Sequence, residues 1–425
     1  MVWQGTTGTP LIWTDTATYQ AVAGHPLLST GFFAGQRPPL VPFVLKLAPS
    51  PTAFTAVQSV VAAVAWVVLA LAIGRLVAAG WRRLVLQGVV LAFATSTPVT
   101  LWNRSVLSES LSLSLLALLV AAVVTTARRV TWPRVTATVV AAVAFAATRD
   151  AQIFTVALLG VGAVVVAAVA ARRRRPWARR GAVLAAGLVA GAAVMSFTVA
   201  HTGRSDQNVY DVLVVRIFPF PDRVAWFAHH GMPEAPAIDA LAAATPAPAA
   251  PAAKVVGFDP DDRTYARLET WIDDHGDATL FLWLLTHPAY ALGEPLRRPE
   301  EAYNYAHGDL LFYAAAGRAA APATPVLWPA WWWLVPLSVL ALAAAYETGA
   351  WREAPWQVVA ALAAVGVVSM LAAWQGDGQE VARHTIEGFA EVRLCVLILA
   401  AVAVLRLVPG RRRSRRDAAA PWPDR

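Results

Sequence analysis

Residues 152–175 read QIFTVALLGVGAVVVAAVAARRRR, an uncharged and largely apolar stretch followed at once by four arginines. About 20 apolar residues are enough to cross the hydrocarbon core of a bilayer as a helix. Arginines that flank such a span mark its cytoplasmic end. The stretch therefore predicts a transmembrane helix together with its orientation, and the rest of the chain repeats the pattern.

The whole chain has the composition of a polytopic membrane protein. Of its 425 residues, 57% are hydrophobic and 15% are charged, whereas soluble domains carry about 25% charge. Nine apolar stretches approach the length of a span: 54–74, 84–101, 107–127, 135–148, 152–171, 181–200, 328–346, 356–373 and 392–408. We therefore predict an all-α integral membrane protein with about nine spans, of which 135–148 is the shortest.

Arginines fall on every second connection between these stretches. They follow the first, third, fifth, seventh and ninth, at Arg75, Arg128, Arg172, Arg352 and Arg411 among others. The positive-inside rule places these connections in the cytoplasm and the others outside. We therefore predict a multi-pass plasma-membrane protein whose N-terminal stretch is extracytoplasmic and whose C-terminus is cytoplasmic. Because residues 1–53 contain no signal segment that could export them, we hypothesise a further span upstream of Met1.

This topology divides the chain into five parts. Residues 1–53 form an outer loop with juxtamembrane helices, 54–201 hold six spans, 202–327 form a large outer loop, 328–408 hold three spans, and 409–425 are a basic cytoplasmic tail. In the large loop the Ala/Pro tract 235–253 reads as a linker. The segments 264–274, 278–286 and 299–315 are predicted to be helical. We expect this loop to pack over the outer ends of the spans.

Ionisable side chains gather at the outer ends of the predicted spans, where they are costly unless they face a cavity or one another. Glu109 follows Ser108 at the start of the third stretch. It is either the acid of a capped first turn or part of a polar site. Arg149 and Asp150 form a two-residue turn between the fourth and fifth stretches. They are either a local ion pair or part of a polar chamber in which Arg149 faces an anion.

A second charged group precedes the last span. Glu380, Arg383, His384 and Glu387 are spaced so that one helix would place all four on one face. The arginine fork suits phosphate, and histidine adds a hydrogen bond or a proton near neutral pH. A solvated charged turn is the alternative. No cofactor is predicted, but a divalent metal on His384 with Glu380 or Glu387 stays open, although no third ligand has a matching spacing.

Several chemistries lack their sequence signatures. The chain contains no Walker loop, dinucleotide fingerprint, nucleophile elbow or His-Glu-x-x-His motif. Cys395 is the only cysteine, so no disulfide framework is available. The arginine cluster at 172–180 is predicted to contact anionic membrane lipids, and nucleic acid is not a predicted partner.

The outer polar segments resemble those of the GT-C membrane glycosyltransferases that use polyprenyl-phosphate sugars, the group of the protein O-mannosyltransferases and aminoarabinose transferases. The resemblance rests on Asp15-Thr16-Ala17-Thr18-Tyr19, Gly35-Gln36-Arg37-Pro38-Pro39-Leu40, Leu107-Ser108-Glu109-Ser110-Leu111, Thr148-Arg149-Asp150 and Glu380-x-x-Arg383-His384. With the alternating topology it covers most of residues 10–200 and 374–408. Two departures are a span that many relatives place before the acidic loop, and the single acid, Asp15, where many carry a pair. The single acid leaves metal dependence open.

The resemblance implies a GT-C-like helical bundle and transfer of a sugar on the outer face. The donor would be a polyprenyl-phosphate-linked sugar, and the acceptor a hydroxyl of a glycan, lipid or protein. Asp15 would act as the base of an inverting single displacement. Arg37, Arg149, Arg383 and His384 would neutralise the donor phosphate, and Glu109, Asp150 and Glu380 are further candidates for substrate binding.

Two other classes stay open. A transporter or flippase of a lipid-linked sugar would need a similar cavity, but transporters more often show repeats and spans broken near mid-membrane. A non-catalytic scaffold would use its long outer loop to bind a partner. An enzyme needs Asp15 in a cavity shared with Arg149 and Arg383, whereas a scaffold would leave these residues scattered and solvated.

Overall fold

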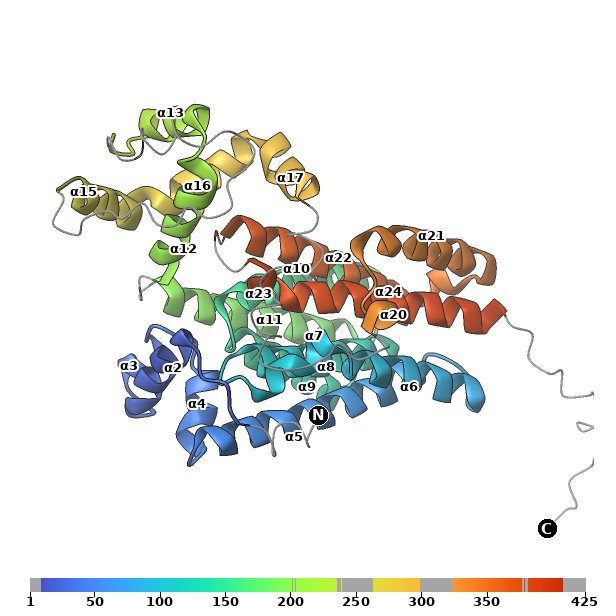
Figure 1. Ribbon diagram of the computed structural model, residues 1–425. Coiled ribbons are helices and arrows are strands. Elements are labelled where there is room, and N and C mark those ends of the chain that lie inside the picture. The colour runs from blue at the N-terminus through green and yellow to red at the C-terminus, as the bar shows by residue number, and fades with distance from the viewer. Residues whose placement is uncertain are drawn as a thin grey trace, which may run out of the picture.

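The protein is built from helices, as the computed structural model in Figure 1 shows. It describes residues 9–200, 202, 204–234, 238, 263–298, 324–376, 378 and 381–407, and within them the one β contact is an isolated bridge between Leu11 and Ser105. Six helices are long and apolar enough to cross a membrane: α5 (Pro51–Gly74), α8 (Glu109–Arg128), α10 (Asp150–Arg172), α11 (Ala178–Ala200), α22 (Ala354–Gly376) and α24 (Ile386–Leu407). They coincide with six of the predicted spans, so the expectation of an all-α multi-pass membrane protein is confirmed.

The other three predicted spans are less regular. The stretch 84–101 is a bent pair, α6 (Trp81–Ala94) followed by α7 (Thr97–Thr100) and the short 3-10 helix η1 (Leu101–Arg104), with 57° between the two parts. Pro98 lies in the first turn of α7, a position that proline favours because its missing N–H is not needed there. The pair counts as a seventh span if it crosses as one unit.

The remaining two are α9 (Trp132–Ala146), with 15 residues, and α21 (Trp331–Thr348), with 18. At 1.5 Å per residue α9 reaches only about 22 Å, short of a hydrocarbon core of about 30 Å. The helix α21 opens with three tryptophans and contains Pro336, and it is less apolar than the six. The count of nine spans therefore stays a prediction.

The core of the bundle is formed by α8 and α24. Their apolar windows are 67% and 78% buried, against 22% for the peripheral α11. The helix α8 packs against α5, α9 and α22, and α24 packs against α21, α22 and α6. The approach of α22 to α24 is close because Gly388 has no side chain: a Cβ there would lie 2.5 Å from Cγ of Met370.

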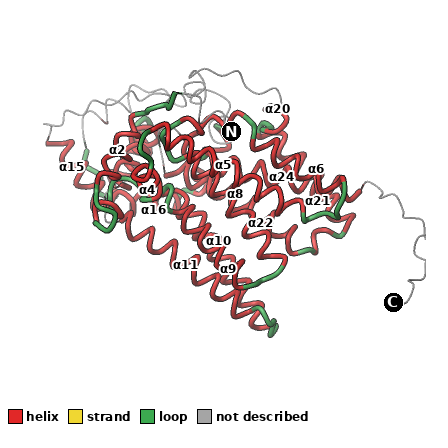
Figure 2. Tube along the Cα trace, turned by 90° about the horizontal axis from the view of Figure 1, so that it is seen from below, coloured by secondary structure: helices red, strands yellow, loops and turns green. Residues whose placement is uncertain are grey.

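Two groups of short helices lie at one end of the long ones (Figures 1 and 2). The first is the N-terminal group α2 (Thr14–Gly24), α3 (Thr30–Phe33) and α4 (Leu40–Leu47). The second comes from the large loop and comprises α12 (Arg204–Val212), η2 (Leu213–Ile217), α13 (Pro221–His229), α15 (Arg263–Trp271), η3 (Ile272–Gly276), α16 (Asp277–Thr286) and α17 (Pro288–Arg297). These loop helices share a small core of their own around Phe227, Trp271 and Trp283.

The large loop packs onto the bundle through α22. The helices α12 and α17 contact α22, and the side-chain amide of Gln375 donates to the carbonyl of Ala291 at 2.7 Å. The predicted helical segments 264–274 and 278–286 correspond to α15 with η3 and to α16. The segment 299–315, nearly all of the tract 235–253 and the tail 409–425 lie outside the described residues.

The basic connections gather at the opposite end of the bundle. Arg75 follows α5, and Arg128 and Arg172 end α8 and α10. Arg180, at the start of α11, donates to the carbonyl of Val130 between α8 and α9 at 3.1 Å. The basic connections thus lie at the end of the long helices remote from the N-terminal group and the loop helices.

Candidate functional site

The N-terminal group is tied to the start of α8 by backbone hydrogen bonds. The amide of Leu11 donates to the carbonyl of Arg104 at 2.8 Å, and the carbonyl of Leu11 accepts from Val106 at 3.0 Å. One turn further on, the hydroxyl of Thr16 donates to the carbonyl of Val106 at 3.0 Å and is completely buried. These bonds hold the first turn of α2, and with it Asp15, against the end of the bundle at which α8 begins.

Asp15 lies between two arginines from distant parts of the chain. Its Oδ1 accepts from Arg37 at 2.8 Å, and its Oδ2 accepts from Arg383 at 2.5 Å. Arg37 also donates through Nε to the hydroxyl of Thr18 at 2.8 Å. Burial by itself would raise the pKa of the Asp15 carboxyl, but the charges of Arg383 and Arg37 outweigh it and hold the pKa below its ordinary value. Asp15 is therefore an anion with both oxygens occupied.

The ionic contacts continue into the bundle. Arg383 also contacts Glu109, from its Nε to Oε1 at 3.2 Å. Arg149 lies 3.6 Å from the same oxygen of Glu109 and 3.2 Å from Oε1 of Glu387. Burial disfavours the charge on Arg149, but Glu387 and Glu109 reverse this and raise its pKa. We call the three arginines Arg37, Arg149 and Arg383 with the three carboxylates Asp15, Glu109 and Glu387 the ionic network; their charges balance.

Glu109 lies in the first turn of its helix and in the ionic network, but the cap predicted for Ser108 is absent. It is the first residue of α8, where a negative charge is favoured by the helix dipole. The side chain of Ser108 makes no capping hydrogen bond to this helix. Glu109 is 1% exposed, and its Oε2 has no hydrogen-bond partner among the described residues. The carboxylate thus retains an unused acceptor inside the network.

His384 is the last residue of the short helix α23 (Val381–His384), next to Arg383. Burial and then the charge of Arg149 lower the pKa of its imidazole to about 3. The ring is therefore neutral at physiological pH, and its Nε2 lies 3.2 Å from a guanidinium nitrogen of Arg383. Since a guanidinium only donates, this Nε2 is the acceptor of that hydrogen bond.

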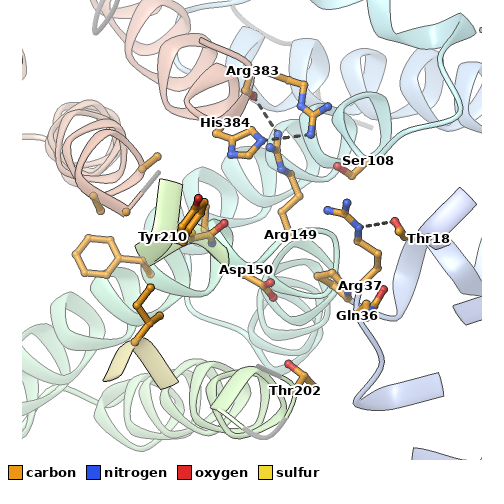
Figure 3. A pocket seen from close by; sticks show the side chains of 18 of the residues that line it. Thr18, Gln36, Arg37, Ser108, Arg149, Asp150, Thr202, Tyr210, Arg383 and His384 are labelled. Carbon is orange, nitrogen blue, oxygen red and sulfur yellow. Dashed lines mark hydrogen bonds between the residues drawn. The ribbon is translucent and has the colours of Figure 1, made fainter. Parts of the chain in front are cut away.

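The three arginines of the network line a cavity of about 920 Å³ between this end of the bundle and the loop helices. Figure 3 shows Arg149, Arg383 and His384 grouped on one side and Arg37 with Thr18 on another. The lining also includes Tyr19, Gln36, Ser108, Asp150, Phe154, Tyr210, Leu268, Glu269, Ile272 and Asp273. Asp15 is not among the lining residues, so the shared cavity expected of an enzyme holds for Arg149 and Arg383 but not for Asp15, whose carboxylate contacts the lining residues Arg37 and Arg383.

The structure brings together most of the residues predicted from the sequence. Asp15, Arg37, Glu109, Arg149 and Arg383 belong to the ionic network, and His384 contacts it. Asp150 lines the cavity, but Arg149 pairs with glutamates of other helices, so the local ion-pair reading of this turn is wrong. Glu380 lies outside the described residues.

Sequence reasoning missed three residues of the site. The sequence predicts Glu387 on one helix face with Arg383, but not as a substrate-binding residue. Tyr19 and Ser108 occur in the motifs that carry the resemblance, without a predicted role. The signal for Glu387 was its position seven residues after Glu380 and shortly before the apolar stretch 392–408, where an ionisable group needs a partner. Within the described part of the chain no three His, Cys, Asp or Glu side chains are grouped as metal ligands.

Comparison of the chain with protein-family models, with curated proteins and with solved structures found no match. Function is therefore inferred from the chemistry of the cavity and its ionic network.

Proposed function

We propose that this protein is a membrane glycosyltransferase of GT-C type that moves a sugar from a polyprenyl phosphate to an acceptor hydroxyl. The proposal includes the predicted topology, with about nine spans in the plasma membrane and the cavity on the extracytoplasmic side. It is carried by one observation: three arginines from separate segments line a cavity, and two of them, Arg37 and Arg383, hold the partly buried carboxylate of Asp15. A scaffold was expected to leave these residues scattered and solvated, whereas Asp15 and Arg383 are in contact.

The arginines suit the phosphate of the donor. Each guanidinium presents several donors in a plane that matches phosphate oxygens. The donor carries one negative charge on its phosphodiester, and in the low-polarity surroundings of the outer membrane rim this charge needs cationic partners. Arg37 and Arg383 are the best placed, because both line the cavity and both are already held in position by Asp15.

The resting contacts imply an order of events. While Arg37 and Arg383 occupy both oxygens of Asp15, its lowered pKa makes it a weak base. A phosphate that draws these arginines toward itself removes the two interactions that lower the pKa, so the carboxylate becomes more basic as the donor binds. Asp15 is then activated by its own substrate.

The proposed step is a single displacement. The acceptor hydroxyl gives its proton to Asp15 while its oxygen forms a bond to the anomeric carbon. The bond from that carbon to the phosphate oxygen breaks at the same time, and its electron pair leaves with the polyprenyl phosphate. The anomeric configuration inverts, and the charge gained by the phosphate is held by the arginines. Asp150 and Glu109 are assigned to positioning of the sugar or acceptor, and His384 to a hydrogen bond that fixes Arg383.

The test is transfer from a lipid-linked sugar by the purified protein. Polyprenyl-phosphate mannose and polyprenyl-phosphate arabinose, each carrying radioactive sugar, serve as donors, and cell-envelope extract serves as the acceptor. Asp15→Asn should reduce transfer at least a hundredfold, the effect typical of losing a general base, and should leave donor binding within a few-fold of the unmodified protein. Arg104→Gln is the matched control, because Arg104 lies at the same end and donates only to the carbonyl of Thr9 among the described residues. Undiminished transfer by Asp15→Asn would remove the proposed mechanism, and movement of the intact donor across vesicles without transfer would favour a flippase.

A further inference from the structure

A second, smaller cavity of about 140 Å³ lies at the arginine-rich end of the bundle. It is formed where α5, α8 and α24 end and α22 begins, at the end of the long helices remote from the loop helices (Figure 1). Its polar lining is Arg75, Arg128, Glu353 and Arg406, and its apolar lining is Leu76, Pro355, Trp356, Val359, Ile398, Leu399 and Val402. None of these residues belongs to the ionic network or to the cavity beside it.

The charges on this cavity are not balanced. Arg406 and Glu353 neutralise each other in a two-pronged ion pair with distances of 2.8 and 2.7 Å. The hydrogen bonds from Arg406 lower the pKa of the Glu353 carboxyl, so it is an anion at neutral pH. Arg75 and Arg128 make no side-chain hydrogen bond or ion pair within the described residues. Two positive charges are therefore left facing the cavity.

Two further features favour an anion. Trp356 is 7% exposed, and its indole Nε1 has no hydrogen-bond partner within the described part of the chain. A buried indole N–H usually finds a partner, although the indoles of Trp66 and Trp374 also have none among the described residues. The first residues of α22 also line the cavity, and the N-terminal end of a helix carries a partial positive charge that favours phosphate.

The apolar residues show what kind of anion fits. Val359, Leu399 and Val402 lie one or more turns inside their helices, so the lining passes from charged at the helix ends to apolar toward the membrane. Such a gradient matches a molecule whose phosphate joins a polar head to a lipid. Basic pockets between spans at this level are suited to anionic headgroups.

We propose that this cavity is a binding site for a phosphate ester, supplied either by the headgroup of an anionic membrane lipid or by a soluble phosphate. Arg75 and Arg128 bind the phosphate oxygens, Trp356 donates its indole N–H, and the pair of Arg406 with Glu353 forms the wall opposite. The site stands apart from the glycosyl-transfer cavity and does not depend on the function proposed for it.

The experiment uses the full chain purified in a neutral detergent and measures binding by native mass spectrometry and by the shift of the thermal unfolding midpoint. The probes are phosphatidylglycerol, phosphatidylcholine and inorganic phosphate. The double variant Arg75→Gln/Arg128→Gln tests the site. Its matched control is Arg129→Gln/Arg173→Gln, which removes the same charge from arginines at the same end that are exposed, as Arg75 and Arg128 are, but do not line the cavity.

Phosphatidylglycerol should bind saturably and phosphatidylcholine much more weakly. Each cavity arginine should contribute about fivefold, the factor that corresponds to about 1 kcal/mol per basic residue near a membrane surface. The double variant should thus bind about 25-fold more weakly, and the control should stay within twofold. Glu353→Gln should tighten binding, because it removes a negative charge and releases Arg406. Tighter binding of phosphatidylglycerol than of inorganic phosphate identifies a lipid ligand, and equal binding of the two identifies a soluble one.

The proposal is overturned if the double variant and its control weaken binding equally, since the anion would then respond to the basic face as a whole. It is also overturned if neither phosphatidylglycerol nor inorganic phosphate binds. The unfolding midpoint without ligand shows whether each variant is folded, and single variants of Arg75 and Arg128 replace the double variant if it is not.

Discussion

Arg383 connects the proposed base to the interior of the protein, so its removal should affect stability and activity in separable ways. Its guanidinium contacts Asp15 at 2.5 Å and Glu109 at 3.2 Å, and its side chain is 8% exposed. Arg383→Gln leaves the network with three carboxylates and two arginines. We expect it to destabilise the protein, to weaken donor binding and to abolish transfer. Asp15→Asn should be less destabilising and should abolish transfer while donor binding is retained.

The magnitudes follow from the contacts. Removing one partner of a buried ion pair costs about 3–5 kcal/mol when the other is left uncompensated. Glu109 keeps Arg149 and Asp15 keeps Arg37, so the lower figure of about 3 kcal/mol applies to Arg383→Gln. For the pair itself, two charges about 4 Å apart gain about 4 kcal/mol at an effective dielectric constant of 20. Because the Asp15 side chain is 21% exposed, solvent screening reduces the expected coupling to about 2 kcal/mol.

A double-mutant cycle measures this coupling. Unfolding midpoints of Asp15→Asn, Arg383→Gln and the double variant are compared in one detergent, where the cycle subtracts effects that the single changes have on their own. The double variant restores equal numbers of charges and should be more stable than the sum of the single changes predicts, but it should remain inactive. Strictly additive midpoints would show that Asp15 and Arg383 do not interact, and transfer by the double variant would refute the roles given to both.

Three further predictions concern other parts of the fold. The pKa of His384 is lowered to about 3, so below pH 6.5 its imidazole is protonated in the unfolded chain but neutral in the folded protein. The free energy of unfolding should therefore fall from pH 6.5 toward 3, by at most about 1.4 kcal/mol per pH unit. The unfolding midpoint of His384→Gln should fall less steeply over the same range. Gly388→Ala should lower the midpoint because its Cβ would lie 2.5 Å from Met370, whereas Gly162→Ala, which meets nothing within 4 Å, should not; equal shifts would contradict the close packing of α22 and α24. Gln58→Leu should lower the free energy of unfolding by about 2–3 kcal/mol, because the amide of Gln58 donates to three buried carbonyls before α8 at 2.8–3.2 Å. Amide hydrogen exchange in the loop before α8 should become faster in this variant, and unchanged exchange would contradict the prediction.

The sequence was most informative where a span is uniformly apolar. Hydropathy alone placed α5, α8 and α10 within a few residues, because a membrane helix must satisfy its own backbone and present apolar side chains. It failed at α24, which begins at Ile386 although the predicted span began at residue 392. The six extra residues include Glu387 and Glu391, both 2% exposed. A hydropathy average excludes such residues, since it does not register that Glu387 meets Arg149 inside the bundle.

The sequence predicted which residues form the site but not which of them contact one another. Topology places Asp15, Arg37, Arg149 and Arg383 at one end of the bundle, and ionisable groups at that level are expected to face one another. The order of contacts depends on helix rotation and on the break between α23 and α24 at Thr385, which no spacing rule supplies. The prediction that Arg383, His384 and Glu387 lie near one another assumed one continuous helix. These residues do meet in the site, but they belong to two helices, α23 and α24.

The balance of charge in the ionic network bears on how the proposed reaction could run. At rest the formal charges of its three arginines and three carboxylates sum to zero, and a donor phosphodiester brings the network and donor together to one negative charge. During transfer the phosphate gains one negative charge as its bond to the sugar breaks, and Asp15 loses one as it takes the proton of the acceptor hydroxyl. The total is unchanged from bound donor to product, so the arginines need only turn from Asp15 toward the phosphate while the charge moves between them. Asp15 is ion-paired with Arg37 and Arg383 at rest, and donor binding would break these pairs. This is consistent with a general base that acts only when the donor is bound.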